Sequence, residues 1–186
     1  MPDRIANKIV LTEDAEQQNL VRRYLEKCGH NVRFARFVTL TAKASGGSGE
    51  KYVRDNYAKQ VKACRSSTGK KASALLIVMI DADTETTEHR ASQLADALKA
   101  EGAMKRGVRE PIVVLIPKRH VETWIRALLG KTVDESTDYT KPQPTHAEIK
   151  SAAEKLHQWT RPSISPPAEF PPSLIDSMPE WRKISG

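Results

Sequence analysis

The chain has 186 residues, of which 30 are Lys or Arg and 23 are Asp or Glu, giving a formal net charge of +7. This length suits one domain with its own core and a tail, and no apolar run approaches the ~18 residues that would indicate a membrane span. No apolar signal segment follows Met1, so we expect a cytoplasmic protein. Cys28 and Cys64 follow no metal-ligand spacing and are expected to be reduced thiols.

Short apolar runs alternate with helical patterns along residues 1–160. The runs predict strands at 8–13, 31–40, 73–80 and 111–116. Helical spacing of apolar residues predicts helices ending near Gly29 and Gly130, and further helices over 50–65, 86–101 and 145–159. This order predicts a three-layer α/β domain with a largely parallel four-stranded sheet flanked by helices.

Residues 161–186 differ from the rest of the chain because they hold six of its eleven prolines. Such a proline content predicts that this Pro-rich tail forms neither a packed helix nor a central strand. It also contains apolar side chains, so we expect it to wrap over the domain or to dock a protein partner; these are Phe170, Leu174, Ile175, Met178 and Trp181.

Acidic residues follow two of the predicted strands. Glu13 comes directly after the first strand, and Asp81 and Asp83 follow the third. The carboxyl ends of parallel strands meet at one edge of a sheet, so these carboxylates should gather there. Packed carboxylates repel one another unless a cation lies between them, and they are the ligands of Mg²⁺ or Mn²⁺. The alternatives are a helix-start acid for Glu13 and an ordinary Asx turn for Asp81 and Asp83.

Glu122 follows the fourth predicted strand and is a candidate fourth carboxylate at the same edge. The alternative is an ion pair along its own helix with Lys118 or Arg126. None of the five histidines has the spacing of a metal-binding motif.

Residues 22–71 contain thirteen Lys or Arg and three acidic residues. A basic region of this kind suits a nucleic-acid polyanion, and the alternative is a solvated basic surface. Within it, a glycine-rich loop would let the backbone approach phosphate, although it is not a Walker A loop. The expected nucleic-acid contacts are Lys43, Gly46, Gly47, Lys51, Arg54, Lys70 and Lys71.

Four segments, in this order, resemble the TOPRIM family: Thr12-Glu13, Gly46-Gly47, Ile80-Asp81-Ala82-Asp83 and residues 114–125. TOPRIM domains occur in topoisomerases, bacterial primases, OLD-family nucleases and small stand-alone bacterial proteins, and the last two are the most similar. The resemblance covers about residues 7–130. One departure is Asp14, where the family usually has Gly after the Glu.

The resemblance implies a Rossmann-like fold and metal-dependent cleavage of nucleic acid, DNA above all. It implies that Asp81 and Asp83 hold metal, that Glu13 holds metal or acts as an acid or base, and that Glu122 completes a second metal position. Lys118, Arg119 and Lys141 are candidates for neutralising charge on the phosphate. OLD nucleases also carry an ATPase, so the resemblance implies a separately encoded ATPase partner, as in multi-gene phage-defence systems.

Two alternatives stay open. The chain is also consistent with a non-catalytic binding or assembly module on the same scaffold. Residues 9–14 and 25–32 further resemble the opening of a response-regulator receiver, in which acids after the first strand hold Mg²⁺ beside a phosphorylated Asp. Asp81 lies further along the chain than that Asp, so a receiver would need an insertion over 41–70.

Overall fold

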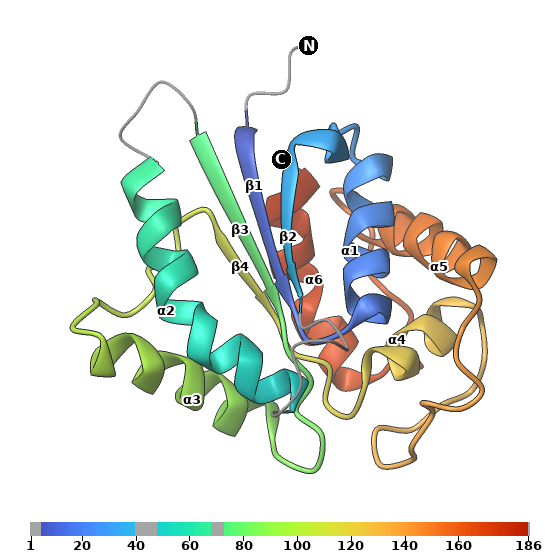
Figure 1. The fold of residues 1–186 in the computed structure, drawn as a ribbon. Helices are drawn as coiled ribbons and strands as arrows, with labels where there is room; N and C mark the ends of the chain where they lie inside the picture. The colour runs from blue at the N-terminus through green and yellow to red at the C-terminus, as the bar shows by residue number, and fades with distance from the viewer. Residues whose placement is uncertain (1–4, 40–47, 68–72, 186) are drawn as a thin grey trace.

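The computed structural model describes residues 5–39, 48–67 and 73–185, which form three layers around a central sheet (Figure 1). The sheet order is β2-β1-β3-β4, and all strand pairs are parallel, as predicted. The strands are β1 (Ile5–Thr12), β2 (Ala35–Thr39), β3 (Ser73–Met79) and β4 (Ile112–Leu115).

Helices cover both faces of the sheet. α2 (Gly49–Ser67) and α3 (Thr87–Ala100) lie on one face, and the other helices lie on the opposite face (Figure 1). Successive side chains of β1 point to opposite faces of the sheet. Ile9 and Leu11 pack with α2, and Val10 packs with the helices on the opposite face. The opposite helices are α1 (Ala15–Lys27), α4 (Val121–Leu128), α5 (His146–Trp159) and α6 (Pro172–Ser185), and a short 3₁₀ helix, η1 (Val32–Phe34), precedes β2.

The chain changes direction across the sheet between β1 and β3. It runs from β1 outward to β2, then crosses back over α2 to β3 on the other side of β1. In such doubly wound sheets, ligands bind at the carboxyl ends of the strands where the order reverses. That edge lies at the bottom of Figure 1, and both β1 and β3 end there.

The expectation that residues 161–186 form no packed helix is wrong. α6 buries Leu174, Met178 and Trp181 in the same hydrophobic cluster as α1, α4 and α5. Pro172 stands at the first helical position, where a missing backbone N–H costs nothing. The hydroxyl of Tyr24 donates to the carbonyl oxygen of Trp181 over 3.1 Å. Apolar side chains that suggested a docking tail thus pack in the hydrophobic core of the domain.

Two side chains from outside the sheet form hydrogen bonds with backbone groups of β4. Arg106 Nη1 donates to the carbonyl oxygen of Ile112 over 2.8 Å, and the backbone N–H of Val114 donates to Glu180 Oε2 over 3.0 Å. Arg106 and Glu180 are also 2.9 Å apart as an ion pair. Since β4 is the last strand of the sheet, these contacts cover an edge that would otherwise be open.

Neither Cys28 nor Cys64, both within the described residues, forms a disulfide bond. Cys64 is buried, and burial raises the pKa of its thiol. Within the described ranges, no helix combines the length and the apolar character needed to cross a bilayer.

Candidate functional site

Glu13 lies just beyond β1 and is held from two sides. The backbone N–H of Asp81 donates to Glu13 Oε1 over 2.6 Å, which joins the ends of β1 and β3. On the other side, Gly49 begins α2 against Glu13. A Cβ at Gly49 would lie 2.8 Å from Glu13 Cβ and 3.2 Å from Glu13 Oε2, so this close approach requires glycine.

The Asp81 carboxylate is buried, with 4 % of the residue exposed. Its Oδ1 atom makes no hydrogen bond of ordinary geometry among the described residues, although the Gln17 side chain is close enough to act against the rise in the Asp81 pKa. Its Oδ2 lies 3.6 Å from His120 Nδ1. Burial, followed by the charges of Asp14, Glu122 and Asp83, raises the pKa of Asp81 well above its ordinary value. A buried acid of this kind requires either a proton or a cation.

The pKa of Glu13 is also raised, from 4.5 to about 9. Burial is the main cause, and the neighbouring charge of Asp81 adds to it, while the hydrogen bond from the Asp81 backbone acts in the opposite direction. Because two neighbouring acids are both held against ionisation, their site favours bound positive charge.

Asp83 adopts a left-handed backbone conformation with φ of 55°. Asp tolerates this region better than most residues, and such strain concentrates at functional sites. Its backbone N–H donates to the carbonyl oxygen of Arg119 over 3.2 Å, which ties the loop after β3 to the loop after β4. The side chain then points between the guanidinium of Arg90 and the imidazole of His120, with Oδ1 3.6 Å from His120 Nδ1 and Oδ2 3.5 Å from Arg90.

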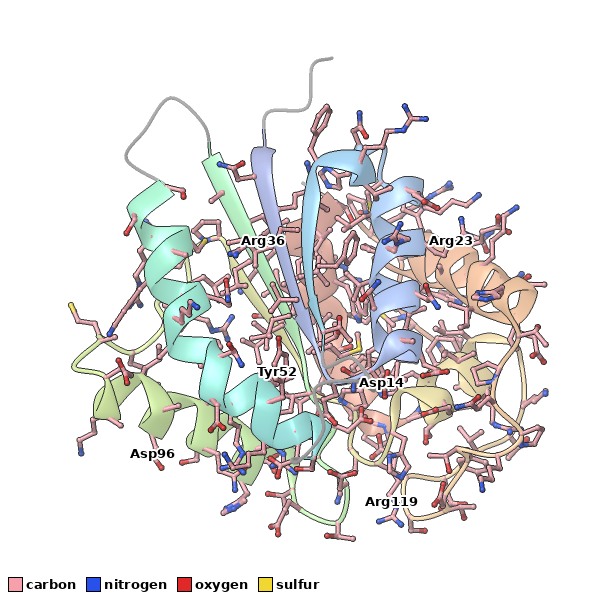
Figure 2. The ribbon with its side chains drawn as sticks, in the orientation of Figure 1. Asp14, Arg23, Arg36, Tyr52, Asp96 and Arg119 are labelled. Atoms are coloured by element: carbon pink, nitrogen blue, oxygen red, sulfur yellow. The ribbon has the colours of Figure 1, made fainter. Side chains whose placement is uncertain are left out.

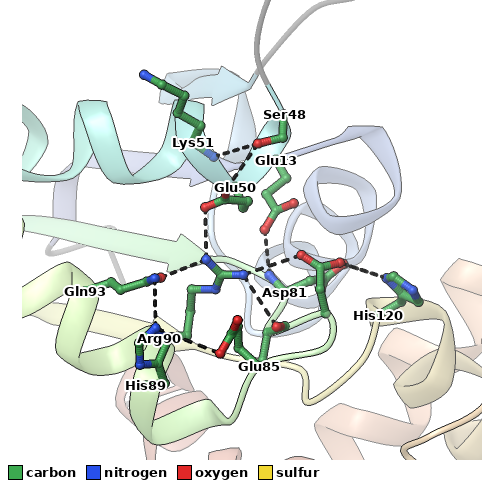
Figure 3. Close-up of polar contacts among 12 residues, drawn as sticks. Glu13, Ser48, Glu50, Lys51, Asp81, Glu85, His89, Arg90, Gln93 and His120 are labelled. Atoms are coloured by element: carbon green, nitrogen blue, oxygen red, sulfur yellow. Dashed lines mark hydrogen bonds and ion pairs between the residues drawn. The ribbon is translucent and has the colours of Figure 1, made fainter.

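Arg90 of α3 is a buried cation beside this cluster, with 4 % of the residue exposed (Figure 3). Its Nη1 donates to Glu50 over 2.9 Å and to Gln93 over 2.8 Å, and its Nη2 contacts the carbonyl oxygen of Ala82 at 3.4 Å. Arg90 therefore connects α3, the first turn of α2 and the loop that carries Asp83. Sequence reasoning missed this residue because it lies within an ordinary helical pattern.

His120 was also missed. It is the N-cap of α4, and its Nδ1 faces both Asp81 and Asp83 (Figure 3). Pairing of the two loops brings it there, since the Ala82 N–H donates to the carbonyl oxygen of Pro117 over 2.8 Å. The signal available in the sequence was its position shortly after a strand, the same signal that singled out the acids.

Glu122 lies in the first turn of α4 and is buried, with 6 % exposed. Burial raises the pKa of its carboxyl, and the charge of Asp14 raises it further. Neither Lys118 nor Arg126, both within the described residues, forms an ion pair with it. Asp14, the N-cap of α1, accepts a hydrogen bond from the backbone of Gln17 over 2.8 Å and lies at the same edge of the sheet (Figure 2).

Basic side chains border a cleft next to Asp83. Lys118 and Arg119 line this cleft of about 490 Å³, together with Thr84, Glu135 and Ser136. Lys118 Nζ donates to the carbonyl oxygen of Glu85, and Arg119 lies at the lower edge of the molecule in Figure 2. Lys141, the third candidate, is exposed and does not line the cleft.

Of the seven expected nucleic-acid contacts, only Lys51 and Arg54 lie within the described residues; Lys43, Gly46, Gly47, Lys70 and Lys71 lie outside them. Lys51 pairs with Asp55 at 2.5 Å, and Arg54 pairs with Glu50 at 2.6 Å. Both cations are thus partly neutralised by acids of their own helix, so the described part of the basic region offers less free charge than its composition indicates.

In the part of the chain that the structure describes, no three acidic, His or Cys side chains already stand as a metal cage. The donor chemistry nevertheless fits a divalent cation. Glu13, Asp81 and Asp83 supply hard oxygen atoms, and the buried Oδ1 of Asp81 lacks a partner that such an ion would provide.

Comparison of this chain with protein-family models, curated proteins and solved structures finds no match.

Proposed function

We propose that this protein is a metal-dependent nuclease, or the nuclease subunit of a larger assembly, that hydrolyses phosphodiester bonds of DNA. The observation that carries the proposal is the buried Asp81 Oδ1, which lacks a hydrogen-bond partner at the strand-order reversal and lies beside Glu13 and Asp83. Its support is chemical, because clustered buried carboxylates suit a divalent cation and such cations most often serve phosphate chemistry.

In this proposal Glu13, Asp81 and Asp83 hold Mg²⁺ or Mn²⁺, and Glu122 serves a second position. The cation supplies charge stabilisation and a more acidic bound water. Without the cation, the raised pKa of Glu13 favours its protonated form near neutral pH, and binding of the cation would displace that proton. Lys118 and Arg119 bind and orient the phosphate in the adjacent cleft. Following the TOPRIM resemblance, we also propose that a separately encoded ATPase works with this chain in phage defence.

The test is cleavage of supercoiled plasmid and single-stranded DNA with Mg²⁺ or Mn²⁺, comparing wild type with Asp81→Asn. Asp96→Asn is the matched control, because Asp96 is exposed on α3, away from the site (Figure 2). We expect cleavage that depends on metal, is lost in Asp81→Asn and persists in Asp96→Asn. Cleavage that survives in Asp81→Asn would show that the nuclease activity lies elsewhere.

DNA binding without cleavage under every metal condition would instead favour a non-catalytic binding subunit. A receiver-like function has one observation in its favour, since acids after β1 lie beside an Asp that follows β3 in a doubly wound sheet. That function predicts a phosphoryl adduct on Asp81 after incubation with acetyl phosphate and Mg²⁺, detectable by mass spectrometry of the peptide containing Asp81.

A further inference from the structure

His120 suggests a more specific property of the site. We propose that its imidazole binds the same divalent cation as Asp81 and Asp83, and that this nitrogen donor makes the site select Mn²⁺ over Mg²⁺. The inference rests on the proposed metal-dependent function and adds a ligand and a metal preference to it.

The imidazole of His120 lies close to both aspartates, although the three side chains do not yet stand at the distances of a metal cage. His120 Nδ1 lies 3.6 Å from Asp81 Oδ2 and 3.6 Å from Asp83 Oδ1. On an octahedral ion with donors at ~2.1 Å, neighbouring donors are about 3 Å apart and opposite donors about 4 Å. The observed separations of 3.6 Å exceed hydrogen-bond length, so Nδ1 is not hydrogen-bonded to either carboxylate, and they must shorten by about 0.6 Å to become those of neighbouring octahedral donors.

The ring of His120 has no structural task in its own helix. It stands at the N-cap of α4, yet its side chain makes no capping hydrogen bond. Its other nitrogen, Nε2, lies 3.9 Å from Oδ1 of Asp138. Metal-binding histidines commonly direct their second ring N–H at a carboxylate, which fixes the tautomer and increases the basicity of the ligating nitrogen. The distance of 3.9 Å is longer than a hydrogen bond, so Asp138 would have to approach before it could hold a proton on Nε2 and leave the lone pair of Nδ1 facing the aspartates.

An independent observation comes from Asp81. Its residue is 4 % exposed, and Oδ1 is buried without a hydrogen-bond partner among the described residues. This oxygen belongs to the same carboxylate as the Oδ2 that faces His120, and a cation bound to that carboxylate would compensate its burial more fully than the Gln17 side chain does.

The mixture of donors determines the preference among ions. Mg²⁺ takes oxygen ligands and gives up its water reluctantly. Imidazole nitrogen is a better ligand for first-row transition metals than for Mg²⁺. A site with two aspartates and one histidine therefore favours the transition metal, and Mn²⁺ is the member of that series that also accepts carboxylates readily.

The experiment loads the full chain with Mn²⁺ and records pulsed electron paramagnetic resonance, which detects nitrogen coordinated to the ion. The variants are His120→Gln and, as a matched control, His89→Gln, because His89 is an exposed histidine on neighbouring α3. We expect nitrogen coupling in wild type and His89→Gln and its loss in His120→Gln. Mn²⁺ affinity should fall at least ~10-fold in His120→Gln, with a smaller change for Mg²⁺ measured by competition.

The wild-type spectrum can overturn the inference by itself, even if His120→Gln fails to fold, and nitrogen coupling that persists in His120→Gln would overturn it as well. Mn²⁺ binding that is lost in Asp81→Asn but shows no nitrogen coupling in wild type would overturn the role of His120 and leave the carboxylate site standing. Absence of Mn²⁺ binding, or binding unaffected by Asp81→Asn, would overturn both this inference and the proposed metal site.

Discussion

Gly49→Ala tests the contact that holds Glu13 in the site. In a helix, Ala is normally more favourable than Gly by about 1 kcal/mol, so the substitution should stabilise α2 if nothing opposed the new methyl group. Atoms of Glu13 leave too little space for that methyl group. The added Cβ would lie 2.8 Å from Glu13 Cβ and 3.2 Å from the Glu13 carbonyl oxygen, where carbon atoms prefer a separation of about 3.5 Å or more.

Relieving this clash requires α2 and Glu13 to separate by about 0.7 Å, which is the difference between the ordinary contact and the available space. Overpacking of this size costs about 1–3 kcal/mol. In a protein of this length each kcal/mol lowers the melting temperature by about 2–4 °C, so we expect a decrease of about 2–12 °C. The hydrogen bond from Asp81 to Glu13 should weaken at the same time.

The assay is thermal unfolding followed by circular dichroism, with Gly107→Ala as the control. A Cβ at Gly107 would meet nothing closer than 3.6 Å, so this control should melt at or slightly above the wild-type temperature. A Gly49→Ala protein as stable as Gly107→Ala would refute the close packing of α2 against Glu13, and with it the argument that α2 positions this carboxyl.

Two further predictions concern α6 and the acids of the site. Trp181→Ala should reduce the free energy of unfolding, measured in urea, by about 3–5 kcal/mol, because Trp181 is fully buried. The control Phe34→Ala should change it by at most about 0.5 kcal/mol, because Phe34 is 72 % exposed. Equal effects of the two substitutions would mean that α6 is not part of the core. The raised pKa of Glu13 favours the protonated folded state, so metal-free protein should lose stability as pH rises from about 4.5 to about 9. Glu13→Gln should flatten this profile in EDTA, and identical slopes for the two proteins would contradict the raised pKa.

The strands and most helices could be predicted because their apolar periodicity is local. β3 was expected at 73–80 and spans Ser73–Met79, and its position placed Asp81 at the correct edge of the sheet. α6 could not be predicted in this way, since counting prolines hid a helical pattern in Leu174, Met178 and Trp181. Position within the helix mattered more than proline number, because Pro172 begins α6.

Two residues of the site, Arg90 and His120, reach it through tertiary pairing, and only His120 had a signal in the sequence, its position shortly after a strand. His120 reaches the aspartates only because the loops after β3 and β4 are hydrogen-bonded to each other. Arg90 reads as one charged residue of an amphipathic helix until α3 packs beside Glu50. Neither contact follows from spacing along the chain.

The ion pair of Arg106 and Glu180 blocks the addition of a further strand at the β4 edge of the sheet. Both side chains occupy backbone groups of β4 that an incoming strand would need. A fifth strand, whether from another copy or from a fibril, must first displace them. α6 therefore protects the β4 edge of the sheet against the addition of a strand from another molecule. A shortened protein that lacks α6 would expose an apolar face of the domain and the unpaired backbone groups of β4.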